Sequence, residues 1–289
     1  MTFAPILWAL LLAAPPLTVT TPGDGAELAL DSWSVGARAA FTMVIEATAT
    51  EAMETGTDSA ERSETVLPGV ELHLAVSITN VSADAATLDV VIERVKAHSR
   101  PGSDSAAAGA LMTGFQEVLP VRWRATLRRS EGIVAIEELS KPSASTGGTL
   151  QMVGDALRAF FVALPSSALR DGTAWRRTSA RKSDNTSLKG TLDVTANAGK
   201  AKGVSATLTF RGTELSDGPS VGPDVGPGIK ATITSMETTA SGTVTLGSDL
   251  LPTSGKLTSD STLVMSVETR KSPVTLKLGE RRSVTLNRR

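Results

Sequence analysis

Several residue types are missing or scarce in this 289-residue chain, and each absence removes a class of chemistry. There is no cysteine, which excludes disulfides, thiolate metal sites, cysteine nucleophiles and iron–sulfur clusters. A lipid anchor of the bacterial lipoprotein type also needs a cysteine, so we expect the chain not to be a lipoprotein. Tyrosine is absent and aromatic residues make up only 3%, so base-stacking platforms are poorly supplied. The net charge of -1 gives no basic field for nucleic acid.

The N-terminal segment also lacks charge. No charged residue occurs from Thr2 to Gly23, and the apolar run Ile6–Ala14 is followed by two prolines. This run is typical of a signal-peptide core, because a membrane-spanning helix needs about 20 apolar residues. We therefore expect residues 1–22 to be a signal peptide, cleaved between Ala14 and Ala26. The mature chain would then be periplasmic or extracellular; an uncleaved anchor and a cytosolic protein are the alternatives.

Alternation of apolar and polar residues runs through most of the chain and predicts strands with one buried face. One polar face per strand favours antiparallel pairing over a parallel α/β sheet. We therefore predict a mainly β fold (β-rich α+β), with an antiparallel meander sheet or half-barrel and one or two packed helices. The clearest alternating segments are 41–47, 70–78, 121–127, 204–210, 263–267 and 274–278.

Helical spacing of apolar residues appears clearly once, from Thr149 to Leu164. Thr149 is predicted to cap this helix and Pro165 to end it. A weaker helix is predicted from Ala106 to Val118, where two glycines lower helix propensity. The residues predicted to line a hydrophobic pocket, or to form core, are Leu150, Val153, Leu157, Phe160, Phe161 and Trp175.

The chain divides into two strand-rich parts at a segment rich in Ser and Gly. The prediction is an N-terminal β-rich half over residues 23–145 and a helix with a C-terminal β-rich half over 146–289; one continuous domain is the alternative. Acidic residues dominate between Glu46 and Glu71, and basic residues dominate after Arg270. These charges fit solvated hairpin faces, or complementary contact within one molecule, between molecules or with anionic lipid.

Three patterns match catalytic or metal-binding motifs without the context that such motifs need. Gly218–Gly222 reads G-x-S-x-G, but prolines follow where the nucleophile elbow needs a helix. Ser179–Lys182 reads S-x-x-K in an expected strand, and no K-T-G motif occurs. The only two histidines, His73 and His98, have no third ligand grouped with them. We therefore predict no enzyme activity, no cofactor and no metal site.

A further motif begins with Leu164-Pro165 and runs through a short spacer to Gly172 and Trp175. This Leu-Pro…Gly-x-x-Trp pattern resembles the signature of a family of uncharacterised exported bacterial proteins, a domain of unknown function. The helix before it and the segment 115–139 are similar too. Ala168 and Thr173 depart from the pattern, which has Pro and Asp there. The resemblance implies fold and export but no activity; physically, we expect Pro165 to stop a helix and Gly172 to supply a turn.

Two functions remain after these exclusions. The first is an exported envelope protein that binds a hydrophobic or lipid-like ligand without catalysis, by analogy with half-barrel carriers of the bacterial envelope. The alternative is a structural or interaction protein of the envelope with no small-molecule ligand. Expected partners are thus a hydrophobic ligand or an envelope protein, with peripheral membrane contact through the basic C-terminal stretch and no nucleic acid. A wide apolar cavity favours the first function and a filled core the second.

Overall fold

A computed structural model of the chain describes residues 17–55, 61–140, 146–183, 186–222, 230–268 and 273–289. These residues form fourteen strands and two helices, α1 and α2. In chain order the elements are β1 (Thr18–Thr21), β2 (Arg38–Thr55), β3 (Glu61–Val66), β4 (Gly69–Val81), β5 (Ala85–His98), α1 (Ser105–Val118), β6 (Val121–Arg128), β7 (Gly132–Glu138), α2 (Gly147–Phe160), β8 (Ala174–Ser183), β9 (Thr186–Ala198), β10 (Ala206–Ser216), β11 (Ser220–Val221), β12 (Lys230–Leu246), β13 (Pro252–Glu268) and β14 (Pro273–Arg288).

All fourteen strands belong to one open sheet, and neighbouring strands pair antiparallel. The strand order is β1-β8-β9-β10-β12-β13-β14-β2-β4-β5-β6-β7, with β3 paired to β2 and β11 to β12. This confirms the predicted mainly β, antiparallel fold. The two predicted halves meet where β14 pairs with β2, so a single sheet runs through both.

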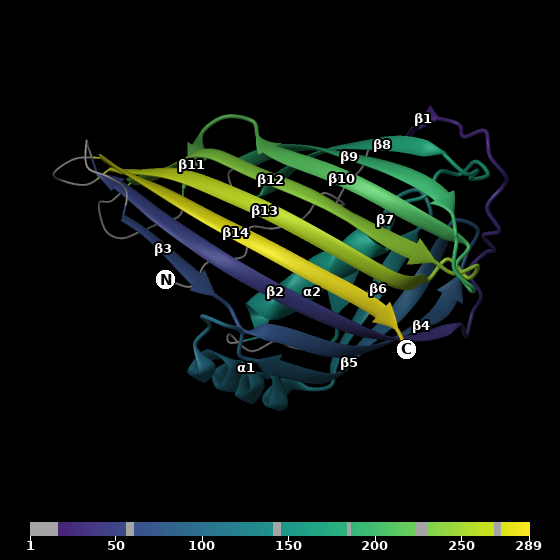
Figure 1. Cartoon of the computed structure of the whole chain (residues 1–289), viewed down its shortest axis with the longest axis horizontal. Helices are drawn as coiled ribbons and strands as arrows, with labels where there is room; N and C mark the ends of the chain where they lie inside the picture. Colours follow the sequence, from purple (N-terminus) through teal and green to yellow (C-terminus); the bar gives the residue numbers. More distant parts are fainter. Residues whose placement is uncertain (1–16, 56–60, 141–145, 184–185, 223–229, 269–272) are drawn as a thin grey trace.

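The sheet curves strongly around helix α2. In Figure 1 the wing formed by β10 to β14 lies in front, the wing formed by β4 to β7 lies behind, and α2 lies between them. The helix contacts β13 on one side and β7 on the other. Gly255 on β13 permits the close approach, because a Cβ there would lie 2.5 Å from ring carbons of Phe160.

Helix α2 is buried on most of its circumference, as an embedded helix should be. Thr146 stands at its N-cap, where its carbonyl oxygen accepts a hydrogen bond of 2.9 Å from the Leu150 N–H. The prediction that Thr149 caps the helix was therefore wrong, because the helix already begins at Gly147 and Thr149 is buried in its first turn. The helix also ends earlier than predicted, at Phe160.

Helix α1 confirms the weaker helix prediction. Asp104 caps it, since its carboxylate accepts a hydrogen bond of 2.8 Å from the Ala106 N–H. Phe115 is fully buried, and the helix packs against β5. Within the described residues, neither helix is long and apolar enough to cross a membrane.

The predicted signal peptide lies only partly within the described residues, which begin at Leu17. β1 falls inside the predicted 1–22 segment, yet it forms one edge of the sheet and pairs with β8, with Val19 opposite Trp175. The carbonyl oxygen of Pro22 also accepts a hydrogen bond of 3.1 Å from Thr173 Oγ1. Cleavage near Ala14 would keep this edge strand, whereas cleavage near Ala26 would remove it.

Candidate functional site

The six residues predicted to form a pocket or core lie in a filled core. Trp175 is 1% exposed, the four predicted residues within α2 are 0% to 2% exposed, and Phe161, just after the helix, is 3% exposed. All six belong to one continuous apolar cluster that includes both wings of the sheet. The cavity beside Trp33 and Phe161 measures about 10 Å³, no more than the space that one water needs. Around these described residues the inner face of the sheet, the face that carries the core, is tightly packed.

The inner face changes character along the long strands β12, β13 and β14. On β14, Val284 and Leu286 belong to the filled core, whereas Glu280 and Arg282 come next on the same face. Beyond them, Leu276 and Leu278 restore an apolar surface at the end of the strand. Because side chains alternate between faces with period two, all six positions share the inner face. The inner face thus has a filled apolar zone, a polar zone and a second apolar zone.

The polar zone is a continuous line across neighbouring strands, which we call the polar band. Thr238 is paired with Ser261 in the register of β12 and β13, and Ser261 is paired with Glu280 of β14. Thr238 Oγ1 donates a hydrogen bond of 3.1 Å to Ser261 Oγ, and Arg282 Nε donates one of 2.8 Å to Glu280 Oε1. The band consists of Glu214, Thr238, Ser259, Ser261, Glu280 and Arg282.

The polar band is unusual because it places acidic and basic side chains inside the protein. Arg282 is 4% exposed and Glu214 is 2% exposed. Removing charged groups from water is costly even when they are paired, and replacing such pairs with apolar residues often leaves stability unchanged or improved. Within the chain, Arg282 is paired with the Glu280 carboxylate and Glu214 also has a partner, so neither side chain is unpaired.

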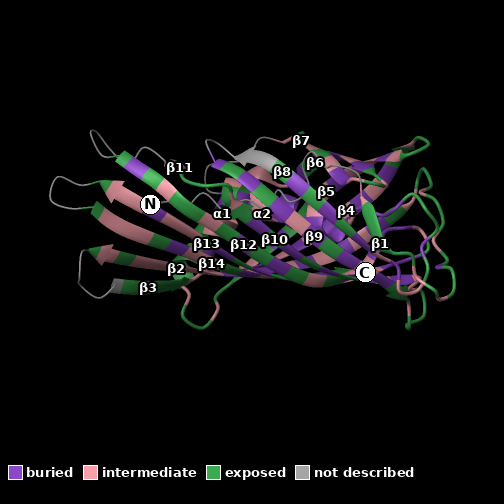
Figure 2. Ribbon diagram, turned by 90° about the horizontal axis from the view of Figure 1, so that it is seen from above, coloured by how far each residue is buried: buried purple, intermediate pink, exposed green. Residues whose placement is uncertain are grey.

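The second apolar zone, which we call the end patch, lies beyond the polar band and apart from the main core. Its members are Met53, Ile233, Met236, Leu263, Met265, Leu276 and Leu278. None of them belongs to the core cluster formed by the buried residues and their packed neighbours. Met265 and Leu278 are buried, Met53 is 43% exposed, and the remaining members are intermediate. Figure 2 shows the same gradient, from purple in the middle of the sheet to pink and green at the end near β3 and β11.

Two buried arginines lie nearer to α2. Burial lowers the pKa of Arg158, although the neighbouring Asp155 carboxylate opposes this shift. Arg158 Nη1 lies 3.3 Å from Asp155 Oδ1, and that carboxylate side chain is only 2% exposed. Burial also lowers the pKa of Arg177, whose Nη1 donates a hydrogen bond of 2.8 Å to the Glu131 carbonyl oxygen. The Arg158–Asp155 contact lies within α2, whereas the Arg177 contact ties β8 to the turn before β7.

The motif residues take up positions in strands. Ser220 lies in the two-residue strand β11, with its Oγ 2.6 Å from Thr186 Oγ1. Ser179 lies in β8. His73 Nε2 lies 3.0 Å from Glu71 Oε1, on the polar face of β4. Within the described residues, no three or more His, Cys, Asp and Glu side chains group as metal ligands do.

The signature segment has a structural role in the fold. Gly172 has a φ of +83°, which favours glycine, and Trp175 is buried at the start of β8. The Leu28 N–H donates a hydrogen bond of 2.8 Å to the Leu169 carbonyl oxygen. The segment therefore anchors the chain that leads from β1 into β2.

The acidic and basic stretches meet within the molecule. β14 pairs with β2 along fifteen residues of β14, from Val274 to Arg288. Lys277 Nζ lies 2.7 Å from Glu54 Oε1, on the outer face of the sheet. The charge pattern allowed contact within one molecule, between molecules or with anionic lipid. The structure contains the contact within one molecule.

Comparison with known proteins gives little similarity. No family profile matches the chain, and no curated protein matches it. An outer membrane channel from Pseudomonas putida F1 is 12% identical, covering 91% of this chain and 98% of its own, with a TM-score of 0.21. OprE of Pseudomonas aeruginosa is 8% identical, covering 87% of this chain and 98% of its own, with a TM-score of 0.16. These TM-scores do not establish a shared fold.

Sequence reasoning missed the polar band, although the sequence contains a signal for it. The alternation of Leu263, Met265 and Val267 predicts one short strand, yet β13 extends back to Pro252. Polar residues at inward positions, such as Ser259 and Ser261, interrupt the apolar rhythm in the middle of this strand. Such interruptions mark buried polar positions when the strand continues on both sides.

Proposed function

We propose that this chain is an exported, non-catalytic binder of a lipid-like ligand, and that the ligand lies on the end patch. The observation that carries the proposal is the order of zones on the inner face. A partly exposed apolar surface adjoins a buried polar band, which matches an amphiphile with an apolar chain and a polar head. Export is supported by the apolar run near the N-terminus.

The apolar chain of the ligand would cover the end patch. Met53, Met236 and Met265 supply flexible, polarizable side chains that adapt to irregular apolar ligands. Burying apolar surface contributes roughly 25 cal/mol per Å², so an acyl chain gains affinity along its whole length. The filled zone around α2 serves stability instead.

The polar head would lie at the near edge of the polar band. Glu280 is the least buried member, with a side chain 18% exposed, and it holds Arg282 by its carboxylate. The Glu280 carboxylate lies between the end patch and Arg282, so a head group meets this hydrogen-bond acceptor first. A head group with hydroxyl donors therefore matches this edge of the band best.

The alternative, a structural or interaction protein of the envelope, is favoured by the filled core at α2. In that case the end patch would be covered by another protein instead of a lipid. The two functions differ in one respect that solution experiments reach directly. The binder takes up a small amphiphile as an isolated chain, whereas the structural protein does not.

Titration with a fluorescent fatty acid tests the proposal. Leu276→Glu places a charge in the end patch, and we expect it to weaken binding at least tenfold. Thr275→Glu is the matched control, because Thr275 is the next residue on β14 and lies on the opposite face. We expect this control to bind like the wild type. Absence of saturable binding by the wild type, or equal loss in both variants, would exclude the end patch as a lipid site.

A further inference from the structure

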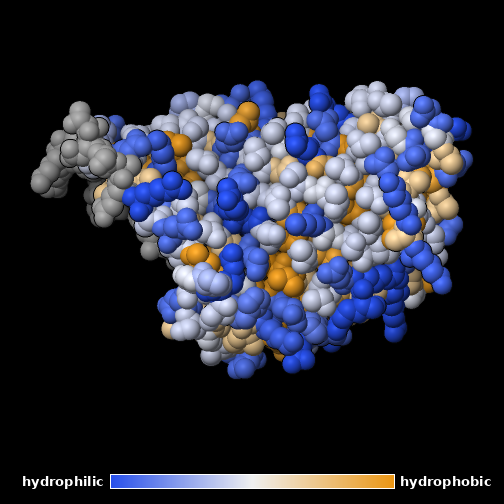
Figure 3. Space-filling view, in the orientation of Figure 1, coloured by the Kyte–Doolittle hydropathy of each residue, from blue (hydrophilic) through white to orange (hydrophobic). Residues whose placement is uncertain are grey.

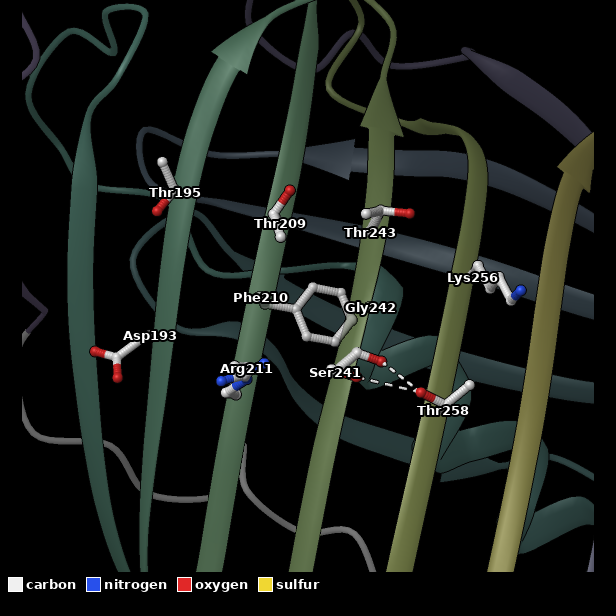
Figure 4. A pocket seen from close by; sticks show the side chains of 10 residues that line it. All are labelled: Asp193, Thr195, Thr209, Phe210, Arg211, Ser241, Gly242, Thr243, Lys256 and Thr258. Atoms are coloured by element: carbon white, nitrogen blue, oxygen red, sulfur yellow. Dashed lines mark hydrogen bonds between the residues drawn. The ribbon is translucent and has the colours of Figure 1, made fainter.

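The outer face of the sheet contains a separate hollow, formed by β9, β10, β12 and β13. It is an open depression of about 630 Å³. Figure 4 shows its side chains from close by, with Phe210 between β10 and β12 beside Gly242. Its other lining residues are mainly hydroxyl-bearing or charged, among them Thr209, Arg211, Ser241, Thr243, Lys256 and Thr258. We call it the outer hollow.

The floor of the outer hollow depends on Gly242. A Cβ at this position would lie 2.5 Å from Phe210 Cζ and would also meet the Lys256 carbonyl oxygen. Phe210 is 4% exposed, so its ring belongs to the inner core and offers the outside little surface. The hollow therefore has no exposed aromatic ring, and its walls combine hydroxyl and charged groups with the apolar carbons of the same side chains.

The charge of the hollow is positive. Arg211 and Lys256 are both exposed, and within the described part of the chain neither forms an ion pair. The carboxylate of Asp193 is already held by Arg176 through two hydrogen bonds of 2.6 and 2.9 Å. Two cations thus remain for a ligand. Arg211 and Lys256 are separated by two strand spacings across the sheet and by two residues along the strands. Their Cα atoms therefore lie about 12 Å apart.

Hydroxyl groups fill the space between these cations. Ser241 Oγ lies 3.2 Å from Thr258 Oγ1, so these two side chains are fixed relative to each other. Thr209 and Thr243 are paired on adjacent strands and both project outward. Each hydroxyl can donate one hydrogen bond and accept others. In Figure 3 the outer face is mostly pale and blue, as expected for hydroxyl-bearing and charged residues.

We propose that the outer hollow binds an acidic oligosaccharide, a carbohydrate chain whose carboxylates pair with Arg211 and Lys256. The row of hydroxyls matches the hydroxyl groups of sugars, and two separated cations match carboxylates spaced along a chain. Nucleic acid is disfavoured, because the hollow has no exposed aromatic ring for base stacking and the whole chain has a net charge of -1. This site is on the opposite face from the end patch and is independent of lipid binding.

Isothermal titration of the folded protein with trigalacturonate tests this site. We expect saturable binding that weakens as salt concentration rises. The double variant Arg211→Ala/Lys256→Ala should bind at least tenfold more weakly. Lys189→Ala is the matched control: Lys189 is an exposed lysine on the same face, outside the hollow, and it is paired with Asp217 at 2.8 Å. We expect its affinity to equal that of the wild type.

Three results would overturn the proposal. The first is no binding of trigalacturonate by the wild type. The second is equal weakening in Lys189→Ala and the double variant, which would indicate attraction by charge alone. The third is equal affinity for the neutral sugar maltotriose, which would remove the role of the two cations. Circular dichroism of each variant establishes that the sheet is intact, and both changes replace exposed side chains.

Discussion

The two apolar ends of the inner face are built by the same strands, yet they have different environments. At one end α2 fills the space between the wings, and Phe160 is fully buried against β13. At the other end the apolar side chains lie outside the core cluster, and Met53 remains 43% exposed. The polar band lies between them. One continuous strand can therefore be covered by a helix along one part and carry a partly exposed apolar surface along another.

The largest difference between the two ends should appear in stability. Phe160→Ala should lower the free energy of unfolding by about 3–5 kcal/mol, through lost burial and a residual cavity. Met53→Ala removes a half-exposed side chain and should cost less than about 1 kcal/mol. Chemical denaturation followed by circular dichroism measures both values. Similar costs for the two variants would contradict the division into a filled and an open end.

A smaller effect should mark the contact between α2 and the sheet. Gly255→Ala would place a methyl group against the Phe160 ring, and we expect a loss of about 1–3 kcal/mol from overpacking. Gly109→Ala in α1 is the control, because nothing lies within 4 Å of the added Cβ. This change should stabilise the protein by about 0.5–1 kcal/mol through helix propensity. Thermal unfolding of the two variants should therefore shift in opposite directions.

The smallest effect concerns the outer face beside the end patch. Lys277 and Glu54 form an ion pair between half-exposed side chains, with exposed fractions of 47% and 39%. Such pairs contribute roughly 0–1 kcal/mol, so a double-mutant cycle with Lys277→Ala and Glu54→Ala should give a small coupling energy. Raising the salt concentration should reduce it further. A coupling energy well above this range would mean that the pair helps to hold β14 on β2.

The strands and helices were predictable from local patterns, whereas their arrangement was not. Period-two alternation over 70–78 and 121–127 depends only on one face being buried, and both segments are strands. The insertion of α2 between two wings depends on contacts between distant segments, such as Phe160 with Gly255. Alternation identifies a buried face without identifying what covers it.

The candidate site was predictable only in part. Sequence reasoning chose the α2 stripe because a helix with one apolar face must bury it. The end patch was present in the alternation of 263–267 and 274–278, but these segments were interpreted as separate short strands. Glu280 and Arg282 interrupt the alternation of apolar and polar residues in β14. The alternation therefore does not predict that one strand continues from the end patch to Val284.

Native mass spectrometry of the mature protein, purified from a bacterial periplasm without added lipid, tests the central claim most directly. The wild type should retain an amphiphile whose mass appears after collisional release. Leu276→Glu should lose that mass, and Thr275→Glu should keep it, because only Leu276 faces the end patch. A wild-type protein that carries no ligand and takes up none from added fatty acid would contradict the claim and favour the structural role.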